Sequence, residues 1–209
     1  MSATDGGSAS PGPIQASDED LGRAVKILVG AFHDDPLWAW AFPDPERRAE
    51  QHRWLWGLYV DGAARYSGVW LDAERNAVAV WIPPGGTELT LEQEASLGHM
   101  LVELAGPEGA GRVSELGDAF EQAHPEHQDH HYLSLLGTDP AHRGRGLGLG
   151  LLRQTLRAVD ETGLPAYLEA SNVANVPLYE RLGFRVRDRF RVADGPEVVT
   201  MWRPASALG

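Results

Sequence analysis

Cysteine is absent from this 209-residue chain. Without a thiol the protein can form no disulfide, no cysteine-ligated zinc or iron–sulfur centre, and no acyl-enzyme on a cysteine. Basic residues are also scarce, because 18 Lys and Arg stand against 30 Asp and Glu and leave a formal net charge of −12. This balance argues against general binding of nucleic acid or anionic membranes, although a local basic site could still hold an anionic ligand.

Long apolar runs are missing as well. No stretch approaches the roughly 18 apolar residues of a transmembrane helix, and the N-terminus lacks the basic start and apolar core of a secretory signal. Residues 1–12 are small and polar, which predicts a disordered tail before one domain over residues 13–209. A hydrophobic content of 43% is ample for its core. We therefore expect a cytoplasmic protein, monomeric or homodimeric, with no nucleic-acid or membrane partner.

Apolar periodicity predicts mostly helices in the first half of the chain. A helix beginning at Ser17 carries an apolar stripe from Leu21 to Phe32, and a second helix is expected over 47–66. The three prolines in residues 33–45 predict a loop between them. Further elements are expected at the following positions: strands over 68–71 and 77–82, and helices over 89–105 and 112–123 separated by a Gly-Pro-Glu-Gly break.

The second half alternates strands and helices. A buried strand is expected from His131 to the residues before Pro140, and a helix follows that ends at Gly163. The remaining elements are a strand over 166–170, a short helix capped by Asn175, and strands over 184–192 and 198–202. This order predicts an α/β fold with one right-handed parallel βαβ unit and hairpin-linked flanking strands.

A glycine-rich turn joins the buried strand to the following helix. Glycine occupies every second position from 144 to 150, where bare backbone N–H groups and the helix dipole can receive a phosphate. The dinucleotide pattern G-x-G-x-x-G fails, because its last position falls on Leu149 or Leu151, and no Lys-Ser or Lys-Thr follows for a P-loop. Arg143 and Arg145 add positive charge, so we expect an anionic ligand at this turn.

Two segments resemble the GNAT acetyltransferase family. Residues 140–148 read P-x-x-R-G-x-G-x-G and are similar to the acetyl-CoA pyrophosphate loop, Gln/Arg-x-x-Gly-x-Gly/Ala, with Arg143, Gly146 and Gly148 in its defined positions. Residues 172–184, NVANVPLYERLGF, resemble the second CoA-side segment of the family. The resemblance implies a single GNAT-type domain, a mixed central sheet with a splayed parallel strand pair, acetyl-CoA as co-substrate and no metal.

The resemblance also implies contacts to the co-substrate. A bulge at Gly137 would splay the strand pair, so that backbone groups of Leu136 and Thr138 bond the pantetheine arm, with Asn175 nearby. Backbone N–H groups of the glycine turn would bond the pyrophosphate. The implied cofactor-binding set is Leu136, Gly137, Thr138, Arg143, Gly144, Arg145, Gly146, Leu147, Gly148 and Asn175.

Two residues are the catalytic candidates. The resemblance places Tyr179 near the thioester sulfur as the acid for the leaving thiolate, and the alternative is a packing tyrosine. For the base we choose Glu169, which shares a strand face with Tyr167 and Ser171, and the alternative is a polar residue at a strand end. The hydroxyls of Ser134 and Ser171 are weaker candidates.

The acceptor site has less support from the sequence. Asp34 and Asp35 could attract a cationic amine beside Trp38, although this segment, with Trp40 and Phe42, could equally be core. The histidines at 124, 127 and 130 are expected in a solvated loop rather than a metal site, because Pro125 interrupts the helix. His131, at the strand entrance, could touch the acceptor. Arg185, Arg187, Arg189 and Arg191 alternate, which predicts a solvated or salt-bridged strand face.

These features together predict an acetyl-CoA-dependent N-acetyltransferase acting on a primary amine of a small molecule, such as an antibiotic-like amine. Transfer would be direct in a ternary complex, since no cysteine can hold the acetyl group. Two alternatives remain: acetylation of a protein lysine or N-terminus, and a non-catalytic module that senses CoA.

Overall fold

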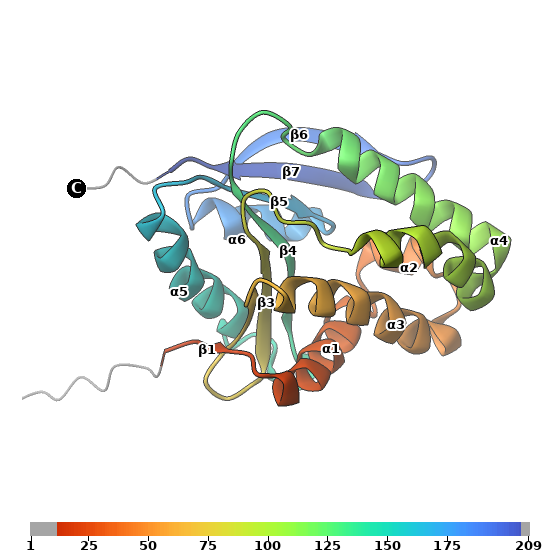
Figure 1. Cartoon of the computed structure of the whole chain (residues 1–209), viewed down its shortest axis with the longest axis horizontal. Coiled ribbons are helices and arrows are strands. Elements are labelled where there is room, and N and C mark those ends of the chain that lie inside the picture. Colours follow the sequence, from red (N-terminus) through yellow and green to blue (C-terminus); the bar gives the residue numbers. More distant parts are fainter. Residues whose placement is uncertain (1–11, 206–209) are drawn as a thin grey trace, which may run out of the picture.

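The computed structural model describes residues 12–205, so nearly all of the tail predicted over 1–12 lies outside the described residues. These residues form a mixed seven-stranded sheet in the order β1-β2-β3-β4-β5-β7-β6 (Figure 1). The strands are β1 (Ile14–Gln15), β2 (Val69–Leu71), β3 (Ala77–Ile82), β4 (His131–Thr138), β5 (Ala166–Ala170), β6 (Arg185–Arg191) and β7 (Glu197–Arg203). The helices are α1 (Asp18–Phe32), α2 (Pro36–Ala41), α3 (Pro45–Ala64), α4 (Leu91–Ala123), α5 (Leu147–Glu161) and α6 (Val176–Glu180).

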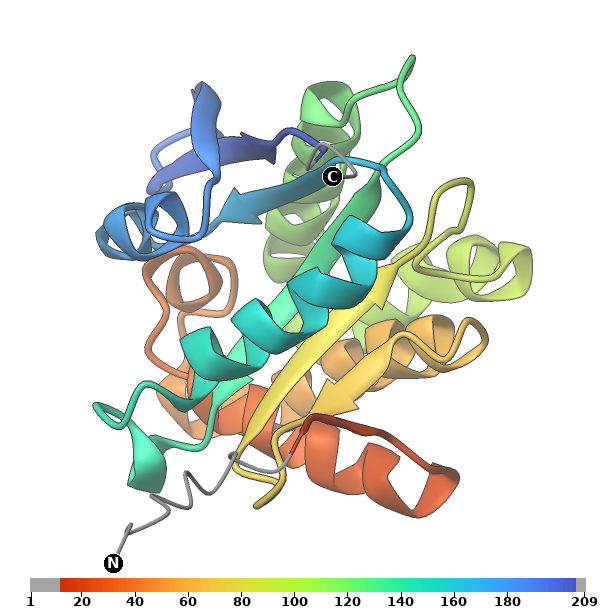
Figure 2. The same cartoon turned by 90° about the vertical axis from the view of Figure 1, so that its left-hand side faces the viewer.

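Helices cover both faces of this sheet. Figure 2 shows α5 lying across one face, with α1 and α3 behind the strands. On β3, Val78 and Val80 pack with α1–α4 in one core, whereas Ala79 and Trp81 pack with α5 in the other. Burial on both faces explains why β3 is apolar at every position. The α/β class with one parallel strand pair is therefore confirmed.

The parallel strands β4 and β5 separate soon after they begin. They pair only from His131↔Ala166 to Leu133↔Leu168. Against β3, Leu135 lies opposite Val80 but Leu133 lies opposite Trp81, so Ser134 is the extra residue of a bulge. The bulge predicted at Gly137 was thus misplaced by three residues. Gly137 instead lets α1 approach the strand, because a Cβ there would lie 3.0 Å from the Cβ of Ala31.

The segment 33–45 is not the loop that its prolines predicted. It contains α2, because Pro36 occupies the first turn, where no backbone N–H is needed, and Asp35 caps the helix. Pro45 likewise begins α3, with Asp44 as its cap. The prolines therefore start helices here rather than breaking them.

The two helices predicted after residue 88 form one long element, α4. Gly106 has φ 72° and ψ 171° and kinks α4, and helical structure resumes at Pro107. The break is one residue wide, because proline is well accommodated in a new first turn. None of the helices within residues 12–205 is long and apolar enough to cross a membrane.

Candidate active site

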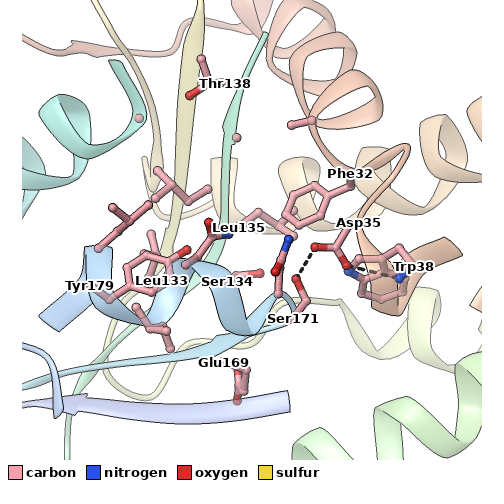
Figure 3. Close-up of a pocket in the computed structure, with 18 of the residues that line it drawn as sticks. Phe32, Asp35, Trp38, Leu133, Ser134, Leu135, Thr138, Glu169, Ser171 and Tyr179 are labelled. Carbon is pink, nitrogen blue, oxygen red and sulfur yellow. Dashed lines mark hydrogen bonds between the residues drawn. The ribbon is translucent and has the colours of Figure 1, made fainter. Parts of the chain in front are cut away.

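A cavity of about 610 Å³ opens where β4 and β5 diverge. It extends from the glycine turn at the carboxyl end of β4 to the apex of the splay, beside Ser134 and Glu169. Figure 3 shows these two ends, with Thr138 far from Glu169. Residues of α1, α2 and α3 form the opposite wall. The cavity therefore connects the predicted co-substrate loop to a second compartment at the apex of the splay.

The glycine turn provides a cradle for an anion. Gly146 caps α5 in the left-handed conformation, with φ 74° and ψ 14°, and has no side chain to bond the first N–H groups of the helix. Gly144, Leu147 and Gly148 line the cavity beside it, and no acidic residue lies in the first turn. Free N–H groups at a helix N-terminus suit a phosphate group. The turn therefore fits the pyrophosphate of acetyl-CoA.

The two arginines of the turn have different positions. The guanidinium of Arg143 donates to the carbonyl oxygens of Ala31 at 2.8 Å and Gly30 at 3.2 Å, which ties the turn to the end of α1. Arg145 does not line the cavity, and its Nη2 lies 3.8 Å from Glu74. Arg143 thus shapes the turn, and Arg145 contributes charge from outside the cavity.

An open strand edge follows between the turn and the apex. Leu136, Gly137 and Thr138 line the cavity on the part of β4 that no longer pairs with β5. Within residues 12–205 no strand pairs with their backbone groups on that side, which suits the amides of a pantetheine arm. Asn175 also lines the cavity, and its side chain forms no capping bond to α6. The residues present therefore fit the extended shape of acetyl-CoA.

Tyr179 projects from α6 into the same cavity. Its hydroxyl makes no hydrogen bond within residues 12–205, and its ring packs edge-on against Phe184 at a centroid distance of 6.2 Å. Burial, together with the negative charge of Asp35, raises the pKa of Tyr179 to about 12. At neutral pH this hydroxyl is protonated, as a proton donor must be.

Glu169 lies at the apex of the splay. Its side chain is 5% exposed, and its Oε1 has no hydrogen-bond partner among the described residues. The nearest basic atom is Nδ1 of His124, 3.8 Å away. Burial of a carboxylate oxygen without a hydrogen bond is costly, and a positively charged ligand would offset that cost.

A second carboxylate, which the sequence reading missed, shares this compartment. Glu88 lies in the segment before α4, lines the cavity and accepts a hydrogen bond from the hydroxyl of Ser134. Burial raises the pKa of Glu88 to about 7, against the opposing effect of Ser134, and the neighbouring charge of Glu169 contributes to the rise. A lone glutamate outside any motif gives no signal in the sequence, because only the fold brings residue 88 to residue 134.

The acidic and aromatic segment after α1 contributes some residues to the cavity wall and others only to packing and hydrogen bonding. Asp35 is buried, caps α2 and accepts a 2.9 Å hydrogen bond from Ser171 (Figure 3). Asp34 lines the cavity with a side chain 80% exposed. Trp38 also lines the cavity and meets Trp56 edge-on at 4.6 Å. Trp40 lies outside the cavity lining, and its indole N–H donates a hydrogen bond to the carboxylate of Asp194.

The histidines at 124, 127 and 130 lie in the loop predicted before β4, and this loop is solvated in part. His131 does not line the cavity, and its Nε2 lies 3.1 Å from the hydroxyl of Thr162, so the structure does not place it with the other acceptor candidates. His130 is buried, with its Nε2 3.1 Å from that of His124, whereas His127 is exposed. The loop therefore places His127 in solvent and the rings of His124 and His130 against each other. Residues 12–205 contain no group of three or more His, Cys, Asp or Glu placed to hold a metal.

Comparisons with known proteins agree with this geometry. Residues 83–184 match the model of the acetyltransferase (GNAT) family. An uncharacterized N-acetyltransferase of Schizosaccharomyces pombe is 28% identical over 176 residues, which cover 79% of this chain and 71% of that protein. The mycothiol acetyltransferase of Rhodococcus erythropolis is 31% identical over 133 residues, or 60% of this chain, and the match spans only 38% of that protein.

A solved structure extends the likeness to nearly the whole chain. The structure described as histone acetyltransferase HPA2 and related acetyltransferase from Corynebacterium glutamicum has a TM-score of 0.70 and 27% identity, covering 95% of this chain and 98% of that one. The residues matched by the family model include the splayed strands, the glycine turn and the helix that bears Tyr179. The chain belongs to the GNAT family of acetyltransferases.

Proposed function

We propose that the protein transfers the acetyl group of acetyl-CoA to the primary amine of a small molecule, directly within a ternary complex. One observation carries this proposal: a single cavity joins an anion cradle and an open strand edge to a compartment with two carboxylates. The first part suits the donor and the second suits a protonated amine. The lack of cysteine excludes an acyl-enzyme on a thiol, which supports direct attack of the acceptor on the thioester.

The chain's own residues have defined tasks in this proposal. The glycine turn binds the pyrophosphate, the open edge of β4 orients the pantetheine arm, and Tyr179 donates a proton to the departing thiolate. Glu169 and Glu88 supply negative charge beside the acceptor nitrogen. Either carboxylate is chemically able to take a proton from the ammonium group.

The acceptor compartment favours a small organic cation over a protein chain. Its wall is lined by aromatic rings: Phe32, Trp38, Trp56, Tyr59, Phe120 and Tyr132. Aromatic faces and buried carboxylates both stabilise a cationic amine. Asp34, exposed at the cavity wall, adds negative charge that attracts such a molecule. A protein substrate would favour an open, shallow groove over a pocket lined with rings.

An amine panel tests the proposal. Acetyl-CoA is incubated with the protein and with monoamines, diamines, arylalkylamines, a lysine peptide and puromycin, and release of free CoA is followed. Puromycin is included because residues 77–84 and 165–171 resemble puromycin N-acetyltransferase. We expect at least one small amine to be acetylated faster than the peptide. Preference for the peptide would favour the protein substrate, and CoA binding with no acetylated amine would favour a sensor.

A further inference from the structure

The main chain at Glu88 is held firmly against α3. A Cβ at Gly62 would come within 1.7 Å of the carbonyl oxygen of Glu88, so only glycine permits this close contact. The guanidinium of Arg65 donates to the carbonyl oxygen of Thr87 at 2.8 Å, and the Thr87 N–H donates to the hydroxyl of Tyr66 at 3.2 Å. The segment therefore presents Glu88 from a rigid support rather than from a mobile loop.

The β4 bulge aims Ser134 at the same point. Leu133 packs in the core beneath α5, whereas Leu135 packs in the core beneath α1–α4. Residues two apart on a regular strand share a face, so the bulge at Ser134 reverses the alternation and turns this side chain into the cavity. There the hydroxyl donates its hydrogen bond to the carboxylate of Glu88.

We propose that Glu88 is the catalytic base that takes a proton from the acceptor's ammonium group, and that Ser134 is its positioning residue. This inference rests on the proposed amine acetyltransferase function and deepens it. It assigns the two carboxylates different roles, because Glu169 lies 3.8 Å from the imidazole of His124, whereas the one hydrogen-bond partner of Glu88 within residues 12–205 is the neutral hydroxyl of Ser134. Glu169 then remains the charge that holds the cation.

The groups around Glu88 support a base that works near neutral pH. They are Ser134 and Tyr132 on β4, Glu169 on β5, Tyr59 on α3 and His124 after α4. No Lys or Arg of residues 12–205 lies within ion-pair distance of this carboxylate. Burial and the charge of Glu169 raise its pKa to about 7. A base whose pKa lies near the working pH removes protons most effectively.

The reaction balances with these groups. Glu88 takes one proton from the ammonium group, and the nitrogen lone pair forms a C–N bond to the thioester carbonyl carbon. The C–S bond then breaks, Tyr179 protonates the departing sulfur, and the second nitrogen proton replaces the one lost by Tyr179. The products are the amide and the CoA thiol, and Glu88 releases its proton to water after they leave.

The test compares Glu88→Gln with a matched control, Glu92→Gln, which changes an exposed glutamate four residues on. With the best amine of the panel, Glu88→Gln should lower kcat/KM at pH 7 by about 10²–10³-fold. In a plot of log kcat/KM against pH, the wild type should show an ascending limb that levels off near pH 7, and this limb should be absent from the variant. The deficit should shrink as pH rises toward the pKa of the amine, where no base is needed. CoA affinity should stay unchanged in both variants.

Ser134→Ala gives a second readout that does not depend on how Glu88→Gln folds. Loss of a hydrogen bond to the charged carboxylate raises the pKa of Glu88, so the limb should move to higher pH while kcat on its plateau falls little. The proposal is overturned in favour of Glu169 if Glu88→Gln retains both the wild-type kcat/KM and the ascending limb of the pH profile, while Glu169→Gln loses both. If the wild-type protein acetylates no amine, the proposed function itself fails, and the inference fails with it.

Discussion

Ser171, one residue beyond β5, donates a 2.9 Å hydrogen bond to the buried carboxylate of Asp35, which caps α2 (Figure 3). The other oxygen of Asp35 accepts from the backbone N–H groups of Leu37 at 3.0 Å and Trp38 at 3.3 Å. This carboxylate therefore connects two segments 136 positions apart across the cavity wall. These hydrogen bonds indicate that Asp35 fixes the position of Trp38, and that this structural role comes before any electrostatic attraction of an acceptor.

We expect Asp35→Ala to destabilise the fold more than Ser171→Ala. The first change removes the cap and leaves the partly buried hydroxyl of Ser171 unpaired, at a cost of about 2 kcal/mol, whereas the second removes one hydrogen bond worth about 1 kcal/mol. Asp34→Asn is the control, because its side chain is mostly exposed. Chemical denaturation measures all three free energies of unfolding, and equal values for Asp35→Ala and Asp34→Asn would contradict this role.

Gly146→Val should abolish CoA binding. The left-handed backbone at this position disfavours a branched side chain by about 1–2 kcal/mol. No atom lies within 4 Å of a Cβ built there, so the side chain would enter the open cradle rather than strike the protein. Gly150→Ala is the matched control, since it also adds a Cβ in open space but lies outside the cavity lining. Calorimetry that shows equal CoA affinity for both variants would remove the turn from the binding site.

Tyr179→Phe should lower kcat and spare binding. The change deletes only the hydroxyl, so the ring keeps its contact with Phe184 and the cavity keeps its shape. General-acid help is worth about 10²–10⁴-fold, and because a thiol already leaves readily we expect a loss of about 10²-fold. Rapid-quench measurement of the chemical step checks this, with the CoA dissociation constant as the control. Full kcat where chemistry limits turnover would make Tyr179 a packing residue.

His52 should make folding stability sensitive to mild acid. It is fully buried on α3 between the rings of Phe42 and Trp56, and burial, with the charge of Arg48, lowers its pKa to about 4. The unfolded chain, with a pKa of about 6.5, then binds more protons between pH 6.5 and 4, so stability falls as pH drops through this window.

Protonation of His52 in the unfolded chain should lower the free energy of unfolding by about 3 kcal/mol across that pH window. His52→Phe removes the titrating group and keeps an aromatic ring, so its free energy of unfolding should depend less on pH between 6.5 and 4. Urea denaturation at several pH values within the window measures both proteins. Parallel curves for the wild type and the variant would assign the acid sensitivity to other groups.

Much of the proposed co-substrate site could be predicted from the sequence, because its parts are contiguous. The glycine turn and α5 follow each other directly, and glycine at a helix start has the same consequence for the backbone in any surroundings. The strand and helix order likewise follows from local periodicity. Local reasoning failed at α2, because prolines that were expected to break helices occupy first-turn positions that need no N–H.

The acceptor side was decided by tertiary structure. The Ser134–Glu88 contact joins residues 46 positions apart, and it exists because a one-residue bulge reverses which face of β4 Ser134 occupies. Side-chain alternation predicts no such reversal, since a bulge depends on the register between β3 and β4. The pKa of Glu88 is raised by water exclusion and by Glu169, and both arise only when α3, β4 and β5 surround it. The residue types came from the sequence, but their proton affinities came from burial, which only the packed chain creates.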